Sequence, residues 1–179
     1  MDIRRVQNCS GVVLRLRGDI KEGDYSRLKS QFRGSETIVG LDVSSAGGIL
    51  EEGLRIADLV RRKELAVYVD GKCNSACAFI FFSAAKRYVG NEPKIGVHSV
   101  SNSRDIEDTE SMLLTMKLAR ISASIGVPQS AVGKMVTTHP GAISYLDQAD
   151  LSALNASATN PFGNNPEKSG QIGQQSCPK

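Results

Sequence analysis

Residues 37–62 read TIVGLDVSSAGGILEEGLRIADLVRR, and this stretch decides the class of fold that we expect. Residues 37–43 are rich in β-branched side chains and form a segment short enough to be a buried strand. Gly47 and Gly48 then break the strand. Beyond them apolar residues recur at helical spacing, at Leu50, Leu54, Ala57 and Val60. The stretch therefore predicts a buried strand, a tight Gly-Gly turn and a helix in direct succession.

The same alternation of strands and helices continues on both sides of this unit. Further strands are predicted over residues 12–17, 65–69, 87–89 and 94–97. Helices are predicted to start near Asp24, to lie within the apolar run of residues 73–82 with a start at Ser75, to span residues 112–123, and to follow Pro128. This alternation predicts an α/β domain with mostly parallel strand pairing.

Length and composition limit the number of domains and the class of protein. A chain of 179 residues with 40% hydrophobic residues fits one globular domain, which we place at residues 1–154. Residues 155–179 are dominated by Gly, Pro, Asn, Ser and Gln, which predicts a polar tail without a core of its own. The net charge of +3 is too small to indicate a nucleic-acid partner. No apolar stretch approaches the ~20 residues that cross a bilayer.

The N-terminus and the four cysteines bear on compartment and metal content. Residues 1–5 (MDIRR) are not followed by the apolar segment of a signal peptide. We therefore expect a periplasmic protein if an export signal has been trimmed, and a cytoplasmic one otherwise. Cys73 and Cys77 have no third Cys or neighbouring His, so we expect no metal and no cofactor. Buried thiols and a Cys73–Cys77 disulfide both remain open, as does a Cys9–Cys177 bridge between the ends of the chain.

Three features carry the candidate chemistry. The backbone of the Gly47-Gly48 turn can approach a ligand closely, although such turns are often only structural. Ser75 starts an apolar helix, where it is either an N-cap or a nucleophile beside free N–H groups. His98 ends a strand, and with His139 it is one of the two histidines available to a Ser–His mechanism.

The order of these elements resembles the proteolytic subunit of the Clp protease (ClpP) and its crotonase-fold relatives. The matching motifs, spread over residues 12–154, are Arg17-Gly18-Asp19-Ile20, Ser45-Ala46-Gly47-Gly48, Asn74-Ser75-Ala76-Cys77-Ala78 and Ile95-Gly96-Val97-His98. The resemblance implies an α/β fold built as a ClpP/crotonase-like spiral of ββα units with mostly parallel sheets. It also implies a serine peptidase-like hydrolase that acts on extended peptides or unfolded proteins.

The resemblance assigns a role to each candidate residue. Ser75 is the implied nucleophile and His98 its general base. Backbone N–H groups of the Gly47-Gly48 turn and of Ala76 would form the oxyanion hole. Ala46 stands where the family has Pro, which loosens the oxyanion loop.

The third member of a Ser–His–Asp triad is not matched in register, because Ile143 or Ser144 stands at the family's Asp position. Asp147 is the candidate that we select, with Asp150 as its neighbour, although both also suit helix capping. The remaining alternatives are Asp105 or Asp108 after His98, a Ser–His dyad, and a Ser–Lys site that uses Lys117.

Two other functions compete with a peptidase. The first is a peptide-binding or scaffold protein that keeps the fold without turnover, which the unmatched Asp motivates. The second is a crotonase-type acyl-CoA enzyme, which shares the Gly-rich oxyanion loop. We also expect a homo-oligomer, for which the stripe of Met112, Met116 and Ala119 is a candidate interface, although the same stripe suits core packing.

Overall fold

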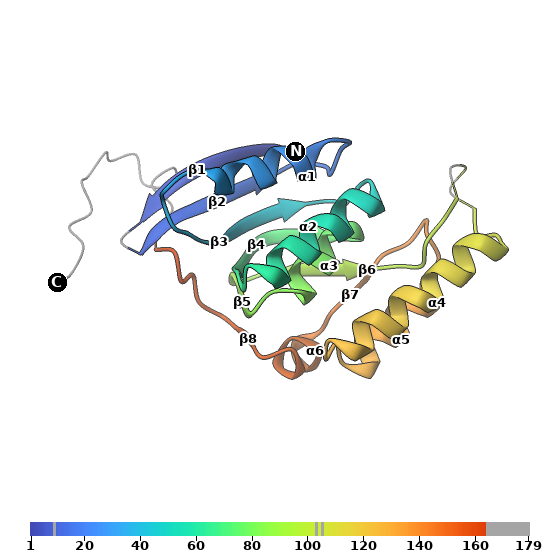
Figure 1. The fold of residues 1–179 in the computed structure, drawn as a ribbon. Coiled ribbons are helices and arrows are strands. Elements are labelled where there is room, and N and C mark those ends of the chain that lie inside the picture. Colours follow the sequence, from blue (N-terminus) through green and yellow to red (C-terminus); the bar gives the residue numbers. More distant parts are fainter. Residues whose placement is uncertain (9, 103, 105, 164–179) are drawn as a thin grey trace.

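The computed structural model describes residues 1–8, 10–102, 104 and 106–163. The strands are β1 (Asp2–Asn8), β2 (Gly11–Arg17), β3 (Ile38–Ser45), β4 (Ala66–Asn74), β5 (Lys86–Val89), β6 (Lys94–Val97), β7 (Ser144–Tyr145) and β8 (Ala156–Ser157). The helices are α1 (Asp24–Ser30), α2 (Leu50–Arg62), α3 (Ala76–Phe82), α4 (Thr109–Ser124), α5 (Gln129–Thr137) and α6 (Gln148–Ala153), with a 3-10 turn η1 (Gln31–Arg33) after α1. Figure 1 shows α1, α2 and α3 beside the sheet, and α4 and α5 together at one end of the molecule.

The strands join in one sheet with the order β1-β2-β3-β4-β5-β8. Neighbouring strands from β2 to β8 in this order pair in parallel, and β1 pairs antiparallel with β2 at the edge. The predicted α/β class with mostly parallel pairing is confirmed. Strand β1 was not predicted, because its charged residues and largely exposed pattern give little hydrophobic signal.

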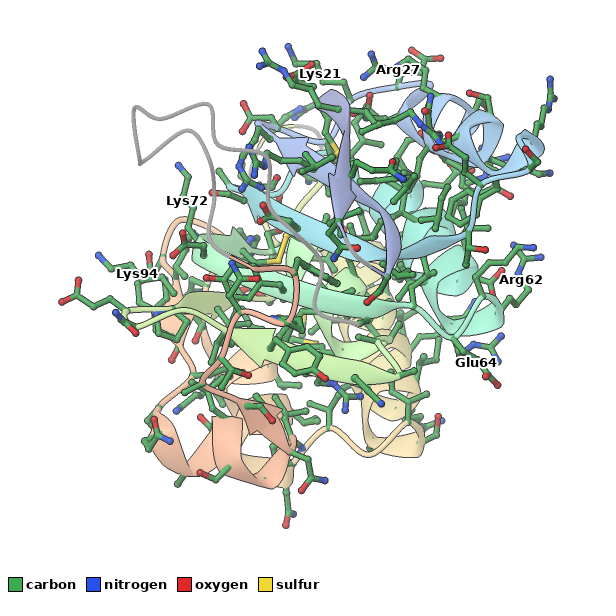
Figure 2. All side chains as sticks on the ribbon, turned by 90° about the vertical axis from the view of Figure 1, so that its left-hand side faces the viewer. Lys21, Arg27, Arg62, Glu64, Lys72 and Lys94 are labelled. Carbon is green, nitrogen blue, oxygen red and sulfur yellow. A yellow bond between two sulfur atoms is a disulfide. The ribbon has the colours of Figure 1, made fainter. Side chains whose placement is uncertain are left out.

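Strand β4 pairs with two different strands along the same edge. Its first half pairs with β5, from Ala66 to Val69. Its second half pairs with β6, in the register Lys72↔Lys94 to Asn74↔Gly96. Figure 2 shows the labelled Lys72 and Lys94 side chains extending outward where this second pairing begins. The split brings the end of β6 beside the end of β4.

The hydrophobic core lies between the sheet and helices α2 and α3. Alternate residues of the three central strands are fully buried there, namely Leu14, Leu16, Leu41, Val43, Val67 and Val69. Gly53 allows α2 to approach α3 closely, because a Cβ at Gly53 would lie 2.9 Å from the Cβ of Ala76. The start of α3 is therefore held tightly between α2 and the sheet.

The segment after α6 packs on the opposite face of the sheet. Ala156–Ser157 forms β8 against β5, and the ring of Phe162 lies edge-on to Tyr68 at 6.5 Å between centroids. A Cβ on Gly40 would collide with Phe162, so this glycine makes room for the ring. The first residues of the predicted tail thus contact the domain, and residues 164–179 lie outside the described part of the chain.

Helix α4 does not bury the stripe that its sequence suggested. Met112 and Met116 are 56% and 52% exposed, and only Ala119 of the stripe is buried. The buried face instead contains Ser111 and Thr115, whose hydroxyls form local hydrogen bonds. Packing of Met112 and Met116 in the core is therefore wrong. Among the described helices, none is long and apolar enough to cross a membrane.

A disulfide joins Cys73 at the end of β4 to Cys77 in the first turn of α3 (Figure 2). Helix α3 starts at Ala76, directly after Ser75, where the sequence predicts its start, whereas strand β4 extends to Asn74, beyond its predicted end at residue 69. Both cysteines are fully buried. Of the two possibilities for this pair, the structure shows the disulfide, while Cys9 and Cys177 lie outside the described residues.

We predict that replacing both cysteines, Cys73→Ala with Cys77→Ala, lowers the free energy of unfolding by about 2 kcal/mol. The loss is at the low end for disulfides, because the bridge closes a short loop. Urea unfolding followed by circular dichroism measures it. In the presence of a reducing agent, the urea midpoint of the parent protein should approach that of the variant. Equal midpoints for the parent and the variant without a reducing agent would contradict the prediction.

Candidate active site

Ser75 occupies a strained turn between β4 and α3. Its backbone angles are φ 54° and ψ −123°. Two other described non-glycine residues have positive φ, Glu64 and Asn155, and each follows the end of a helix. Ser75 instead precedes a helix, where no capping geometry calls for such angles. Strain of this kind costs of order 1–3 kcal/mol and is concentrated at functional sites.

The backbone around Ser75 is anchored on both sides, while its hydroxyl makes no cap. The Ser75 N–H donates to the carbonyl of Gly96 on β6 at 2.8 Å, and its carbonyl accepts from Ala78 at 2.9 Å. The side chain forms no hydrogen bond with the helix that it precedes. Ser75 lines a cavity of about 300 Å³. The interpretation of Ser75 as a side-chain N-cap is therefore not supported.

The Gly47-Gly48 turn lies directly against Ser75. A Cβ on Gly47 would lie 2.8 Å from the Cβ of Ser75, and one on Gly48 would collide with the carbonyl of Ile20. Both glycines have positive φ, 105° and 135°. Only glycine therefore fits at these two positions without strain.

Two backbone N–H groups are available beside Ser75. Gly48 forms a parallel bridge with Ile20 in which its neighbours make the hydrogen bonds, Ile20 N–H to Gly47 and Ile49 N–H to Ile20. The Gly48 N–H therefore points away from Ile20, and Gly48 lines the cavity. Ala76 is the first residue of α3, so its N–H has no acceptor within the helix. This pair can accommodate a developing negative charge.

His98 follows β6 and lines the same cavity as Ser75 and Gly48. Its ring Nδ1 lies 2.7 Å from the carbonyl oxygen of Ser99. A carbonyl can only accept, so Nδ1 carries the proton and donates it, which leaves Nε2 as the basic nitrogen. Within the described residues no hydrogen bond joins His98 to Ser75, and such contacts often tighten only when a substrate binds.

The remaining wall of the cavity is mainly apolar. Side chains from α2, α3, β6, α4 and α5 contribute to it, namely Leu50, Phe79, Val97, Leu118 and Met135. An apolar wall opposite a serine and a histidine suits a ligand with a hydrophobic group beside a polar reacting centre. No group of three or more His, Cys, Asp or Glu side chains that could hold a metal ion occurs within the described residues.

Asp147 lies elsewhere, at the N-terminus of α6. Its side chain accepts from the N–H of Asp150 and pairs with Lys134 at 2.8 Å. The hydrogen bond from Lys134 lowers the pKa of Asp147 below its ordinary value. Asp147 does not line the cavity that contains Ser75 and His98. The structure therefore does not bring Asp147 together with Ser75 and His98, and helix capping and Lys134 engage its carboxylate.

Of the other candidates for a third group, those that the structure describes do not line this cavity either. Asp150 is buried, and Ser130 and Lys134 donate to it. Asp108 caps α4 through the N–H of Ser111. Lys117 is exposed on α4, and Asp105 lies outside the described residues.

A carboxylate that the sequence did not indicate lies close to His98. Glu107 accepts a hydrogen bond from the hydroxyl of Ser99, the residue whose carbonyl binds the His98 ring. Its other oxygen lies 3.1 Å from Nδ1 of His139, which is exposed. No spacing rule links residue 107 to residue 98, and the only signal was the acidic stretch of residues 105–108 that contains it.

The buried Asp150 generates a prediction about stability and pH. Burial alone would raise the pKa of Asp150, but hydrogen bonds from Lys134, Ser130 and Asp147 hold this pKa below its ordinary value. A lowered pKa in the folded protein contributes stability that is present above the unfolded pKa of about 3.9 and is lost as the pH falls through the folded pKa. We predict that Asp150→Asn costs about 2 kcal/mol of unfolding free energy near neutral pH.

The difference between parent and Asp150→Asn should shrink as the pH falls below about 4. Urea unfolding at a series of pH values measures it. Asp147→Asn is the matched control, because Asp147 pairs with the same Lys134 but is 62% exposed. A loss for Asp147→Asn as large as that for Asp150→Asn would show that burial is not the deciding factor.

Comparisons with known proteins identify the fold. No protein-family model matches the chain, and no curated protein matches it in sequence. Among solved structures, ClpP1 from Listeria monocytogenes matches with a TM-score of 0.61 and 19% sequence identity, over 83% of this chain and 91% of the ClpP1 chain. A point mutant of that ClpP1 matches with a TM-score of 0.63 and 16% identity, over 83% of this chain and 92% of its own. The chain therefore has the ClpP-like fold.

Proposed function

We propose that the protein is a serine peptidase-like hydrolase with Ser75 as nucleophile and His98 as general base. The observation that carries the proposal is the position of Ser75 in a strained turn, where its hydroxyl does not cap the following helix. Ser75 and His98 line the same cavity. The N–H groups of Gly48 and Ala76 complete an oxyanion hole beside it. The ClpP-like fold supports this assignment.

The proposed reaction is acyl transfer through Ser75. Nε2 of His98 takes the hydroxyl proton while Oγ attacks a substrate carbonyl. The N–H groups of Gly48 and Ala76 donate to the resulting oxyanion. The amine leaves with the proton from His98. His98 then takes a proton from a water molecule as this water attacks the acyl-enzyme, and it returns the proton to Ser75 Oγ as the carboxylic acid product leaves.

The substrate that we propose is an extended peptide, free or within an unfolded protein. The apolar wall of the cavity offers a site for one hydrophobic side chain next to the reacting carbonyl. Beside β6 lies β7, a two-residue strand at the edge of the sheet. An extended peptide can pair with such an edge through its backbone.

Labelling with a fluorophosphonate probe tests the nucleophile. We expect the parent protein to be labelled and Ser75→Ala not to be, because the probe reacts with an activated serine hydroxyl. Ser101→Ala is the matched control, since Ser101 lines the same cavity and its loss should leave labelling unchanged. We expect His98→Gln to slow labelling by about 100-fold or more.

Equal labelling of the parent and Ser75→Ala would show that Ser75 is not the nucleophile. A parent that is not labelled, does not cleave a peptide library and yet binds peptides saturably would favour a peptide-binding protein that retains the fold without turnover. The hydrogen bonding of His98 to a backbone carbonyl, rather than to a carboxylate, is the observation that keeps this second function in view.

We also propose that the chain forms a homo-oligomer through α4. Four large apolar side chains are exposed on this helix, Met112, Leu113, Met116 and Ile121, at 56%, 61%, 52% and 45%. Contiguous exposed apolar surface of this kind is typical of interaction sites. Light scattering coupled to size-exclusion chromatography should give a mass above that of the 19.2 kDa chain.

The variant Met112→Lys with Met116→Lys should shift that mass toward the monomer, because two charges cannot be buried unpaired in an interface. Glu51→Lys, on the exposed side of α2, is the control that should leave the mass unchanged. A monomeric parent at high concentration would refute the proposal.

A further inference from the structure

The segment that follows His98 is held in place by several hydrogen bonds. Ser99 is 1% exposed. Its N–H donates to the carbonyl of Thr138 at 2.8 Å, its hydroxyl donates to Glu107, and its carbonyl accepts from the His98 ring. Every polar group of Ser99 is therefore engaged.

The next residue is anchored as well. The N–H of Val100 donates to the hydroxyl of Thr115 on α4 at 2.9 Å. That hydroxyl donates in turn to the carbonyl of Ser111, one turn earlier in the helix. The backbone at Val100 is thus bound to α4, and the side chain of Ser99 is bound to Glu107 in the loop that precedes α4.

Glu107 connects this segment to a third element. One carboxylate oxygen accepts from Ser99, and the other lies 3.1 Å from the ring of His139. The hydrogen bond from the Ser99 hydroxyl, with a further one from His139, lowers the pKa of Glu107. Glu107 is therefore ionised at neutral pH, when His98 would act as a base.

We propose that Glu107 is the positioning residue for His98 and acts through Ser99. By holding the Ser99 side chain, Glu107 places the carbonyl that accepts from Nδ1 and so directs the basic Nε2 toward the cavity. A neutral imidazole can carry its proton on either nitrogen, and the wrong tautomer would present an N–H instead of a lone pair. The catalytic part of this inference rests on the proposed function, whereas the control of the tautomer does not.

The sign of the charge suits the same role. When His98 takes a proton from Ser75 it becomes an imidazolium ion, and a negative charge nearby stabilises that ion. Glu107 is two hydrogen bonds away through Ser99. Through Ser99, Glu107 therefore supplies the negative charge that a directly bound Asp supplies in a Ser–His–Asp triad.

Nuclear magnetic resonance of protein labelled with ¹⁵N-histidine tests the tautomer without any need for activity. The chain has two histidines, so the spectrum of His98→Gln assigns both rings. Well above the ordinary histidine pKa of about 6.5, we expect His98 in the parent to have a protonated Nδ1 and an unprotonated Nε2. Glu107→Ala should give a mixture of tautomers at His98.

Asp108→Asn is the matched control, because Asp108 is the adjacent carboxylate but caps α4 and does not bind Ser99. It should leave the His98 tautomer unchanged. A folded Glu107→Ala protein with the same single His98 tautomer as the parent would overturn the proposal. If Glu107→Ala does not fold, Ser99→Ala replaces it and should also give a mixture of tautomers, because it removes the hydroxyl that Glu107 binds. A further variant, Glu107→Gln, keeps an amide oxygen that accepts from Ser99 but carries no charge.

The two variants separate placement from charge in the labelling assay. Glu107→Ala should slow fluorophosphonate labelling by about 100-fold, the cost of misplacing a catalytic group by about 1 Å. Glu107→Gln should retain the parent tautomer and lose a smaller part of the rate. Unchanged labelling of Glu107→Gln would refute the role of the charge. A parent that keeps the expected tautomer but is never labelled would refute the proposed function while leaving the positioning by Glu107 intact.

Discussion

The hydrogen bond from the Ser75 N–H to the Gly96 carbonyl, at 2.8 Å, is the contact on which the candidate site depends. It exists because β4 leaves β5 after Val69 and pairs instead with β6 over Lys72–Asn74. Had β4 continued along β5, the end of β6 would not lie beside Ser75. The split pairing therefore converts a separation of 23 positions in the sequence between Ser75 and His98 into a shared cavity wall.

The strain at Ser75 is maintained by its surroundings rather than by its own sequence preference. Serine does not favour a φ of 54°, so the conformation persists only if neighbouring contacts determine it more strongly than the strain opposes it. The Cys73–Cys77 bridge spans the turn, and Gly47, in the loop between β3 and α2, packs against Ser75. On the remaining side α2 contacts Ala76 through Gly53. Each contact comes from a different element, which explains why a small fold can sustain a backbone that costs a few kcal/mol.

Sequence patterns predicted the parts of the structure that depend on local chemistry. The β3–α2 unit follows from β-branched residues, two glycines and helical spacing, all of which act within a few residues of one another. The same patterns ended β4 too early, because a run such as Cys73–Phe82 is apolar in either conformation and does not show that the strand continues to Asn74. They also suggested that Met112 and Met116 could pack in a core, whereas the adjacent face of α4 is buried, where Thr115 accepts a hydrogen bond from Val100. Local hydrophobicity does not reveal which face of a helix the rest of the fold will cover.

The carboxylate that acts with His98 could not be identified from local sequence patterns either. Asp147 suited the expected order of a triad, but its carboxylate caps α6 and pairs with Lys134, and a move toward His98 would break both contacts. Glu107 lies in irregular chain before α4, where no period or spacing predicts a partner. Only the tertiary structure shows that Ser99 links it to His98. A backbone carbonyl can fix the tautomer of a histidine but carries no charge, so a carboxylate one hydrogen bond further away supplies what the carbonyl lacks. Orientation and charge, which one Asp provides in a triad, are thus divided here between Ser99 and Glu107.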